Sequence, residues 1–129
     1  MDKFDIDAYA ARLYERRSEG VITSFAEASS DDWTPSKNEC HANVTDWCEH
    51  YLGHKPVRGW LYFDFDNLLP IVRFNAHSVI ENENGELFDI TPSKASQRYP
   101  FIRAEESEEE FAFLVEELNT TIINYSVKR

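Results

Sequence analysis

The first half of the chain carries apolar side chains at helical spacing. Residues 5–18 repeat them every three or four positions, which predicts an amphipathic helix. Asp5 or Asp7 can cap its N-terminus, and Gly20 ends the pattern. Residues 24–37 are rich in Ser, Asp, Thr and Pro and show no such period, so they predict a loop or a short helical turn.

A second helix is predicted to begin at Cys40. Asn38 is a suitable N-cap for it, and Gly53 is a suitable residue for its C-terminal stop. Cys40 then lies in the first turn, where unpaired backbone N–H groups create a positive potential. Such a potential lowers the pKa of a thiol and can hold an oxyanion, so Cys40 is a candidate nucleophile. The inward face of this helix consists of Cys40, Val44, Trp47, Cys48 and Tyr51.

Beyond the second helix the pattern changes to that of β-strands. Residues 57–65 are aromatic and β-prone, and residues 71–80 and 86–90 form two further candidate strands. The Asn84-Gly85 dipeptide between these two strands is typical of a hairpin. Residues 121–127 predict a last strand.

A third helix is predicted near the C-terminal end of the chain. Ser107 and Glu110 have the spacing of a capping box. The apolar positions that follow predict a helix through Leu118, whereas residues 94–104 carry no assignment from the sequence.

The order of these elements predicts one α+β domain over residues 1–129. We expect N-terminal helices packed on an antiparallel β-sheet. No internal repeat or linker divides the chain, and the length is enough for a proper hydrophobic core.

Composition and charge exclude some partners. The formal net charge is −11 and the pI about 4.7, so the chain repels nucleic acid and anionic membranes, and we expect neither as a partner. The first residues lack a basic stretch followed by an apolar run, and no apolar segment approaches membrane-spanning length. We therefore expect a cytoplasmic location. The sequence carries no signal for an oligomeric state.

The two cysteines do not indicate a disulfide or a zinc site. On one helix Cys40 and Cys48 would lie roughly 12 Å apart, too far to bridge or to share a tetrahedral ion. His50 and His54 complete a set of four possible zinc ligands, but the spacing contains no Cys-x-x-Cys knuckle. We expect reduced thiols, no metal and no cofactor.

Three residues could form one catalytic site. Cys40 would supply a thiolate, His77 in the second strand would take its proton, and Asp89 in the third strand would orient the imidazole. Each residue taken alone has a more ordinary explanation: a small apolar side chain, a structural histidine and a turn former. The combination is what favours a Cys-His-Asp triad.

The hairpin register tests this triad. A two-residue turn at Asn84-Gly85 would pair Asp89 with Ile80 and point it away from His77, because side chains alternate along a strand. A three-residue loop centred on Asn84 would place Asp89 diagonal to His77, and a five-residue loop centred on Glu83 would place them directly opposite. We predict a loop with an odd number of residues.

The same segments resemble a known enzyme family. Residues 74–80 (FNAHSVI) and 84–92 (NGELFDITP), downstream of a helix that opens with cysteine, are similar to the transglutaminase-like branch of the papain-like cysteine peptidases. The resemblance covers residues 40–92. It implies a papain-like, transglutaminase-like core in which Cys40 is the nucleophile, His77 the base and Asp89 the orienting acid.

One position departs from this family. Papain-type enzymes carry a glutamine, a donor to the oxyanion, about six residues before the cysteine, and Thr34 stands there in this chain. Trp33, Asn38 and Asn43 are nearby substitutes. His41 directly follows Cys40 and points about 100° away along the helix, so we interpret it as a flanking residue that could touch substrate.

The predicted activity is acyl transfer from an amide or peptide substrate through an acyl-cysteine intermediate, ending on water or on an amine. Two alternatives stay open. An inactive relative could bind a protein or a small ligand in the cleft, and a cleft sealed by aromatic side chains would mark it. A thioester-dependent acyltransferase could use the same triad, and a deep pocket for a pantetheine arm would mark that.

Overall fold

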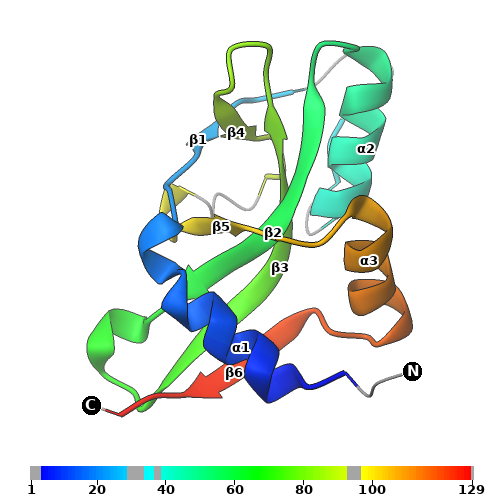
Figure 1. Ribbon diagram of the computed structural model, residues 1–129. Coiled ribbons are helices and arrows are strands. Elements are labelled where there is room, and N and C mark those ends of the chain that lie inside the picture. The colour runs from blue at the N-terminus through cyan, green and yellow to red at the C-terminus, as the bar shows by residue number, and fades with distance from the viewer. Residues whose placement is uncertain (1–3, 29–33, 37–38, 93–96, 129) are drawn as a thin grey trace.

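The long hairpin of β2 (Lys55–Phe63) and β3 (Ile71–Glu81) is the centre of the fold. The computed structural model describes residues 4–28, 34–36, 39–92 and 97–128. A six-stranded sheet has the order β1-β4-β3-β2-β5, and β6 also pairs with β3 (Figure 1). The shorter strands are β1 (Ser24–Phe25), β4 (Leu87–Asp89), β5 (Phe101–Arg103) and β6 (Ile122–Ser126).

The sheet is mixed, which corrects the prediction of an antiparallel sheet. All pairs except one are antiparallel, and β1 pairs with β4 in parallel. The parallel strand β1 lies in the segment predicted as a loop, and β5 lies in the stretch that the sequence left unassigned. Both are too short, at two and three residues, for a periodic pattern to show.

The first predicted strand ends earlier than expected. It runs from Lys55 to Phe63, and the next residues form a short 3₁₀ turn over Phe65–Asn67. All three residues of this turn have positive φ angles between 55° and 63°. A left-handed backbone cannot continue a strand, so the aromatic pattern extends beyond the strand itself.

Local capping signals at the first and third helices are confirmed. In α1 (Ile6–Glu15) the side chain of Asp5 accepts a hydrogen bond from the N–H of Ala8 at 3.1 Å. Ser107 and Glu110 form the capping box of α3 (Glu108–Ala112). A π-helical turn, Phe113–Glu117, continues α3, and a 3₁₀ turn, Arg17–Glu19, follows α1.

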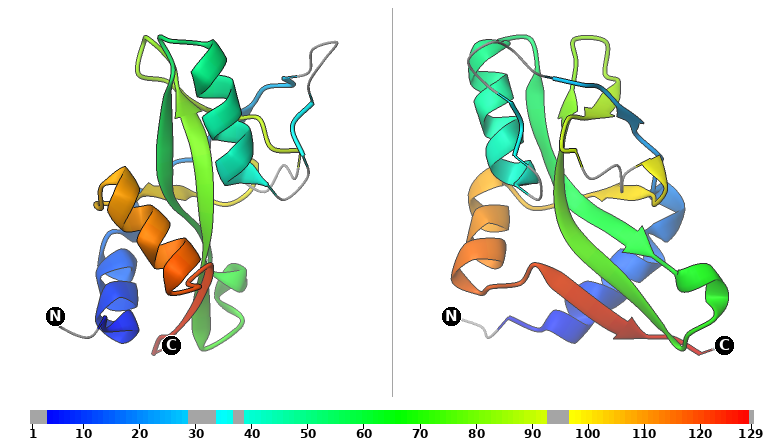
Figure 2. Two further views of the ribbon diagram at one scale, coloured as in Figure 1. Left: turned by 90° about the vertical axis from the view of Figure 1, so that its right-hand side faces the viewer. Right: turned by 180° about the vertical axis from the view of Figure 1, so that it is seen from behind.

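The helices pack on different parts of the β2–β3 hairpin. α2 (Cys40–His50) lies beside the upper part of β2 and β3, α3 lies below it, and α1 crosses the lower part (Figures 1 and 2). The largest core cluster joins α1, α3 and the sheet around Trp60, Phe74 and Phe111. Among the residues that the structure describes, no helix has the length and apolar character needed to cross a bilayer.

Candidate active site

Cys40 is the first residue of α2, as predicted. The N-cap is Glu39, without a capping side-chain bond, so the prediction of Asn38 as N-cap is wrong. The helix ends at His50 with Tyr51 as its C-cap. Gly53 therefore lies beyond the stop position, and its φ angle is not positive. Val44 fixes the helix on the sheet by packing in a buried cluster that also contains Ala28, Ile80 and Ile90.

The hairpin between β3 and β4 has the predicted odd loop. Ile80 pairs with Phe88, which centres the turn on Asn84. The N–H of Asn82 donates to the carbonyl of Glu86 at 2.9 Å and encloses three residues between them. Gly85 has a φ of 80°, a left-handed conformation that favours glycine. This register points Asp89 to the same face of the sheet as His77, diagonal to it.

His77 and Asp89 form a buried hydrogen bond. Nε2 of His77 lies 2.7 Å from Oδ2 of Asp89, and Asp89 is fully buried. The other carboxylate oxygen accepts the N–H of Thr91 at 2.9 Å, so Asp89 is held from both sides. Because Nε2 is engaged, Nδ1 is the ring nitrogen left for Cys40.

His77 lies in the part of β3 between the residues that pair with β6 and the residues that pair with β4. The ladder with β6 ends at Asn75 and the ladder with β4 begins at Ile80. Helix α2 packs against β3, and the thiol of Cys40 at its first residue interacts with the His77 ring. Cys40, His77 and Asp89 thus come from α2, β3 and β4.

The electrostatics of the site favour an ion pair. Burial raises the pKa of Cys40, but hydrogen bonds with His41 and His77 outweigh it and lower the pKa to about 6. Burial lowers the pKa of His77, but its bonds to Asp89 and Cys40 raise it to about 9. Between these values the thiolate and the imidazolium coexist. Cys48 behaves differently, because burial raises its pKa.

His41 is part of the candidate site and does not merely flank it. Its side chain interacts with the Cys40 thiol, and its Nδ1 forms a hydrogen bond with Oγ of Ser78. Arg58 donates to the same hydroxyl at 2.9 Å and to the carbonyl of His41 at 3.2 Å. Neither Ser78 nor Arg58 was singled out from the sequence, because both lie on strands where polar residues are common.

Asn43 is buried and joins two distant segments of the chain by hydrogen bonds. Its side-chain amide donates to the carbonyl of Ser36 at 2.8 Å and to Oγ1 of Thr91 at 3.1 Å, and its Oδ1 accepts the N–H of Ser36. Both amide hydrogens are therefore used. Asn43 holds the segment before α2 against the end of β4, which positions Cys40 relative to Asp89.

Trp33 and Asn38 lie outside the described residues, and Thr34 is exposed. No cluster of three or more metal-binding side chains occurs in the part of the chain that the structure describes. The histidines of the rejected zinc set have other contacts. His54 accepts from Nε1 of Trp47 at 2.9 Å and pairs with Glu83, and His50 contacts the carbonyl of Asp46.

A cavity of about 390 Å³ lies beside His41, between α2 and α3. Its walls combine polar and apolar side chains, among them Thr45, Arg58, Glu108 and Phe111. Comparison with known proteins adds no relative: no family model, curated protein or solved structure matches the chain.

Proposed function

We propose that this protein is a cysteine-dependent acyl-transfer enzyme with Cys40 as nucleophile, His77 as acid and base, and Asp89 as the group that orients His77. The substrate would contain an amide or peptide bond, and the acceptor would be water or an amine. The observation that carries this proposal is the buried bond between His77 and Asp89 on one side of the ring and the Cys40 thiol on the other.

In the proposed reaction the Cys40 thiolate attacks the carbonyl carbon. A C–S bond forms, and the π electrons of the carbonyl move onto its oxygen. Backbone N–H groups at the start of α2 can donate hydrogen bonds to this oxyanion. The intermediate collapses, the C–N bond breaks, and His77 gives its Nδ1 proton to the leaving amine. Water or an amine then attacks the acyl-cysteine while His77 takes its proton, and the departure of the thiolate completes the cycle.

The arrangement of elements also supports the family hypothesis. A cysteine that begins a helix, followed by a histidine and an aspartate on adjacent antiparallel strands, is the order in the transglutaminase-like branch of the papain-like peptidases. We propose membership of that branch on this order and on the segments of residues 74–92.

The test is the pH dependence of alkylation by iodoacetamide, with mass spectrometry to locate the label. Because the pKa of Cys40 is lowered to about 6, its thiolate is present above that pH. Labelling of Cys40 should rise through about pH 6, whereas that of Cys48, whose pKa burial raises, should rise only at a higher pH than for an ordinary thiol. In His77→Ala the Cys40 profile should move toward that of an ordinary thiol.

Cys48 is an internal control, because it experiences the same reagent and the same pH. The measurement contradicts the proposal if Cys40 and Cys48 label with the same profile, or if the His77→Ala change leaves the Cys40 profile in place. A non-catalytic binding domain would then be the better description.

A further inference from the structure

The hydroxyl of Ser78 sets the tautomer of the His41 ring. Ser78 is fully buried, and within the described part of the chain its Oγ has two hydrogen-bond partners, Nη1 of Arg58 and Nδ1 of His41. A guanidinium can only donate, so Arg58 fills an acceptor position of the hydroxyl. The single hydrogen of Ser78 is then free to be donated to Nδ1 of His41.

The opposite arrangement is less favourable. If Nδ1 of His41 carried the hydrogen, both neighbours would donate to Oγ, and the Ser78 hydrogen would lack an acceptor in a buried position, which is costly. With Nδ1 of His41 accepting the hydrogen of Ser78, the ring N–H of His41 lies on Nε2.

Arg58 is itself firmly held. It forms an ion pair with Glu108 at 2.9 Å, donates to Oγ1 of Thr45 at 3.0 Å and reaches the backbone carbonyl of His41. The ring of His41 packs edge-on against Phe111, with 5.7 Å between ring centroids. These contacts fix the position of the His41 ring while leaving it half-exposed beside the cavity between α2 and α3.

We propose that His41 is the side-chain donor to the oxyanion, with Ser78 and Arg58 as the residues that set its tautomer. This inference rests on the proposed acyl-transfer function. When the thiolate bonds to the carbonyl carbon, the carbonyl oxygen becomes an anion next to Sγ, and the side chain of His41 already interacts with that thiol. His41 gives a hydrogen bond from Nε2 and transfers no proton, and His77 remains the only proton carrier. His41 takes the role for which the family uses a glutamine, at a different position in the chain.

The experiment compares two reactions of Cys40 at pH 7. Alkylation by iodoacetamide develops no oxyanion, whereas acylation by p-nitrophenyl acetate passes through one. His41→Ala should reduce acylation by about 10²–10³-fold, the loss typical of one oxyanion donor, and alkylation by less than about tenfold. His41→Gln, which restores a side-chain N–H, should recover most of the acylation rate, and Ser78→Ala should give an intermediate loss.

His50→Ala is the matched control, since it removes an exposed histidine from the same helix, and circular dichroism establishes that each variant is folded. Equal losses of both reactions in His41→Ala, or no recovery in His41→Gln, would overturn the oxyanion role. If wild-type Cys40 is alkylated rapidly but not acylated, the acyl-transfer proposal itself fails and this inference fails with it.

Discussion

At the scale of single residues, the site depends on the different partners of the two ring nitrogens of His77. Nε2 is bonded to a buried carboxylate, which leaves Nδ1 for the interaction with the Cys40 thiol. The carboxylate favours the protonated ring, and the protonated ring favours the thiolate. The Asp89 side chain thus influences the Cys40 thiol through the His77 ring.

Asp89→Asn should separate these effects. The neutral amide can still accept the N–H of Thr91, but it no longer stabilises the imidazolium, so the pKa of His77 should fall by about 1–3 units. The Cys40 thiol should become correspondingly harder to ionise. An NMR titration of isotope-labelled histidine measures the first effect and the alkylation profile the second. An unchanged His77 titration would show that Asp89 does not control its charge.

At the scale of elements, the β3–β4 hairpin decides which residues meet. Oδ1 of Asn82 accepts hydrogen bonds from the N–H groups of Asn84 and Glu86, and Gly85 supplies the left-handed step. A loop with an even number of residues would turn Asp89 to the other face of the sheet. The turn is exposed, yet it sets the register that brings Asp89 to the face of His77.

Gly85→Ala should destabilise the protein by about 1 kcal/mol. Apart from the two adjacent residues, no atom of the described residues lies within 4 Å of the position that a new Cβ would occupy, so the cost comes from the backbone conformation and not from a clash. Gly85→Asn is the control, because asparagine tolerates a positive φ and should cost less. Urea unfolding measures both variants, and equal losses for Ala and Asn would contradict the backbone explanation.

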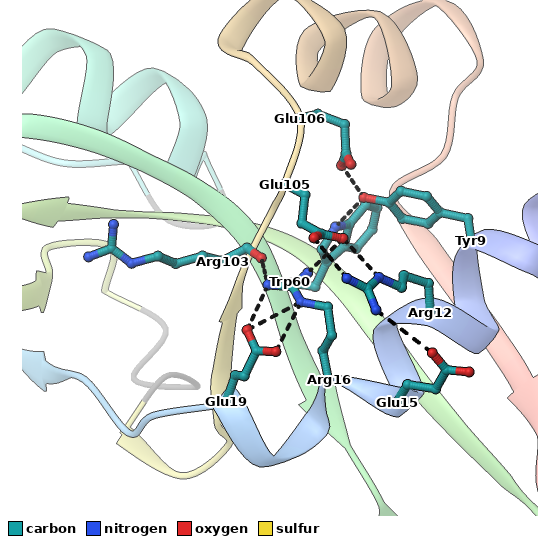
Figure 3. A network of polar contacts seen from close by, with 9 residues as sticks. All are labelled: Tyr9, Arg12, Glu15, Arg16, Glu19, Trp60, Arg103, Glu105 and Glu106. Carbon is teal, nitrogen blue, oxygen red and sulfur yellow. Dashed lines mark hydrogen bonds and ion pairs between the residues drawn. The ribbon is translucent and has the colours of Figure 1, made fainter.

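At the scale of the whole molecule, a polar network joins α1 to the sheet and to the segment before α3 (Figure 3). Nε1 of the buried Trp60 donates to the hydroxyl of Tyr9 at 3.0 Å, and that hydroxyl donates to Glu106. Arg16 donates to the carbonyl of Arg103 at 2.7 Å. Burial and the nearby Glu106 raise the pKa of Tyr9, so its hydroxyl keeps the proton that it donates.

Tyr9→Phe should reduce the free energy of unfolding by about 1–3 kcal/mol, because Trp60 would keep a buried N–H without an acceptor. Tyr125→Phe is the matched control, since Tyr125 packs on the same core cluster and is only half-buried. Thermal and urea unfolding measure the two variants. A Tyr9→Phe loss no larger than that of the control would mean that the Trp60 bond contributes little.

The sequence alone determined the features that depend on local chemistry. Asp5 and the Ser107–Glu110 box start their helices because short polar side chains satisfy nearby N–H groups, and Cys40 opens α2 at the residue where the helical period begins. The odd hairpin loop also followed from the sequence, because the alternation of apolar residues requires Asp89 to share a face with His77.

Only the tertiary structure decided the features that join distant segments. The parallel pairing of β1 with β4 arises from two residues whose pattern is too short to detect. His41 belongs to the candidate site because Ser78 and Arg58, from two strands, hold its ring. Asn43 joins two segments because Ser36 and Thr91 both lie within hydrogen-bond distance of its side chain. A side chain's spacing along a helix gives its direction, but its hydrogen-bond partners depend on which other elements pack against that face.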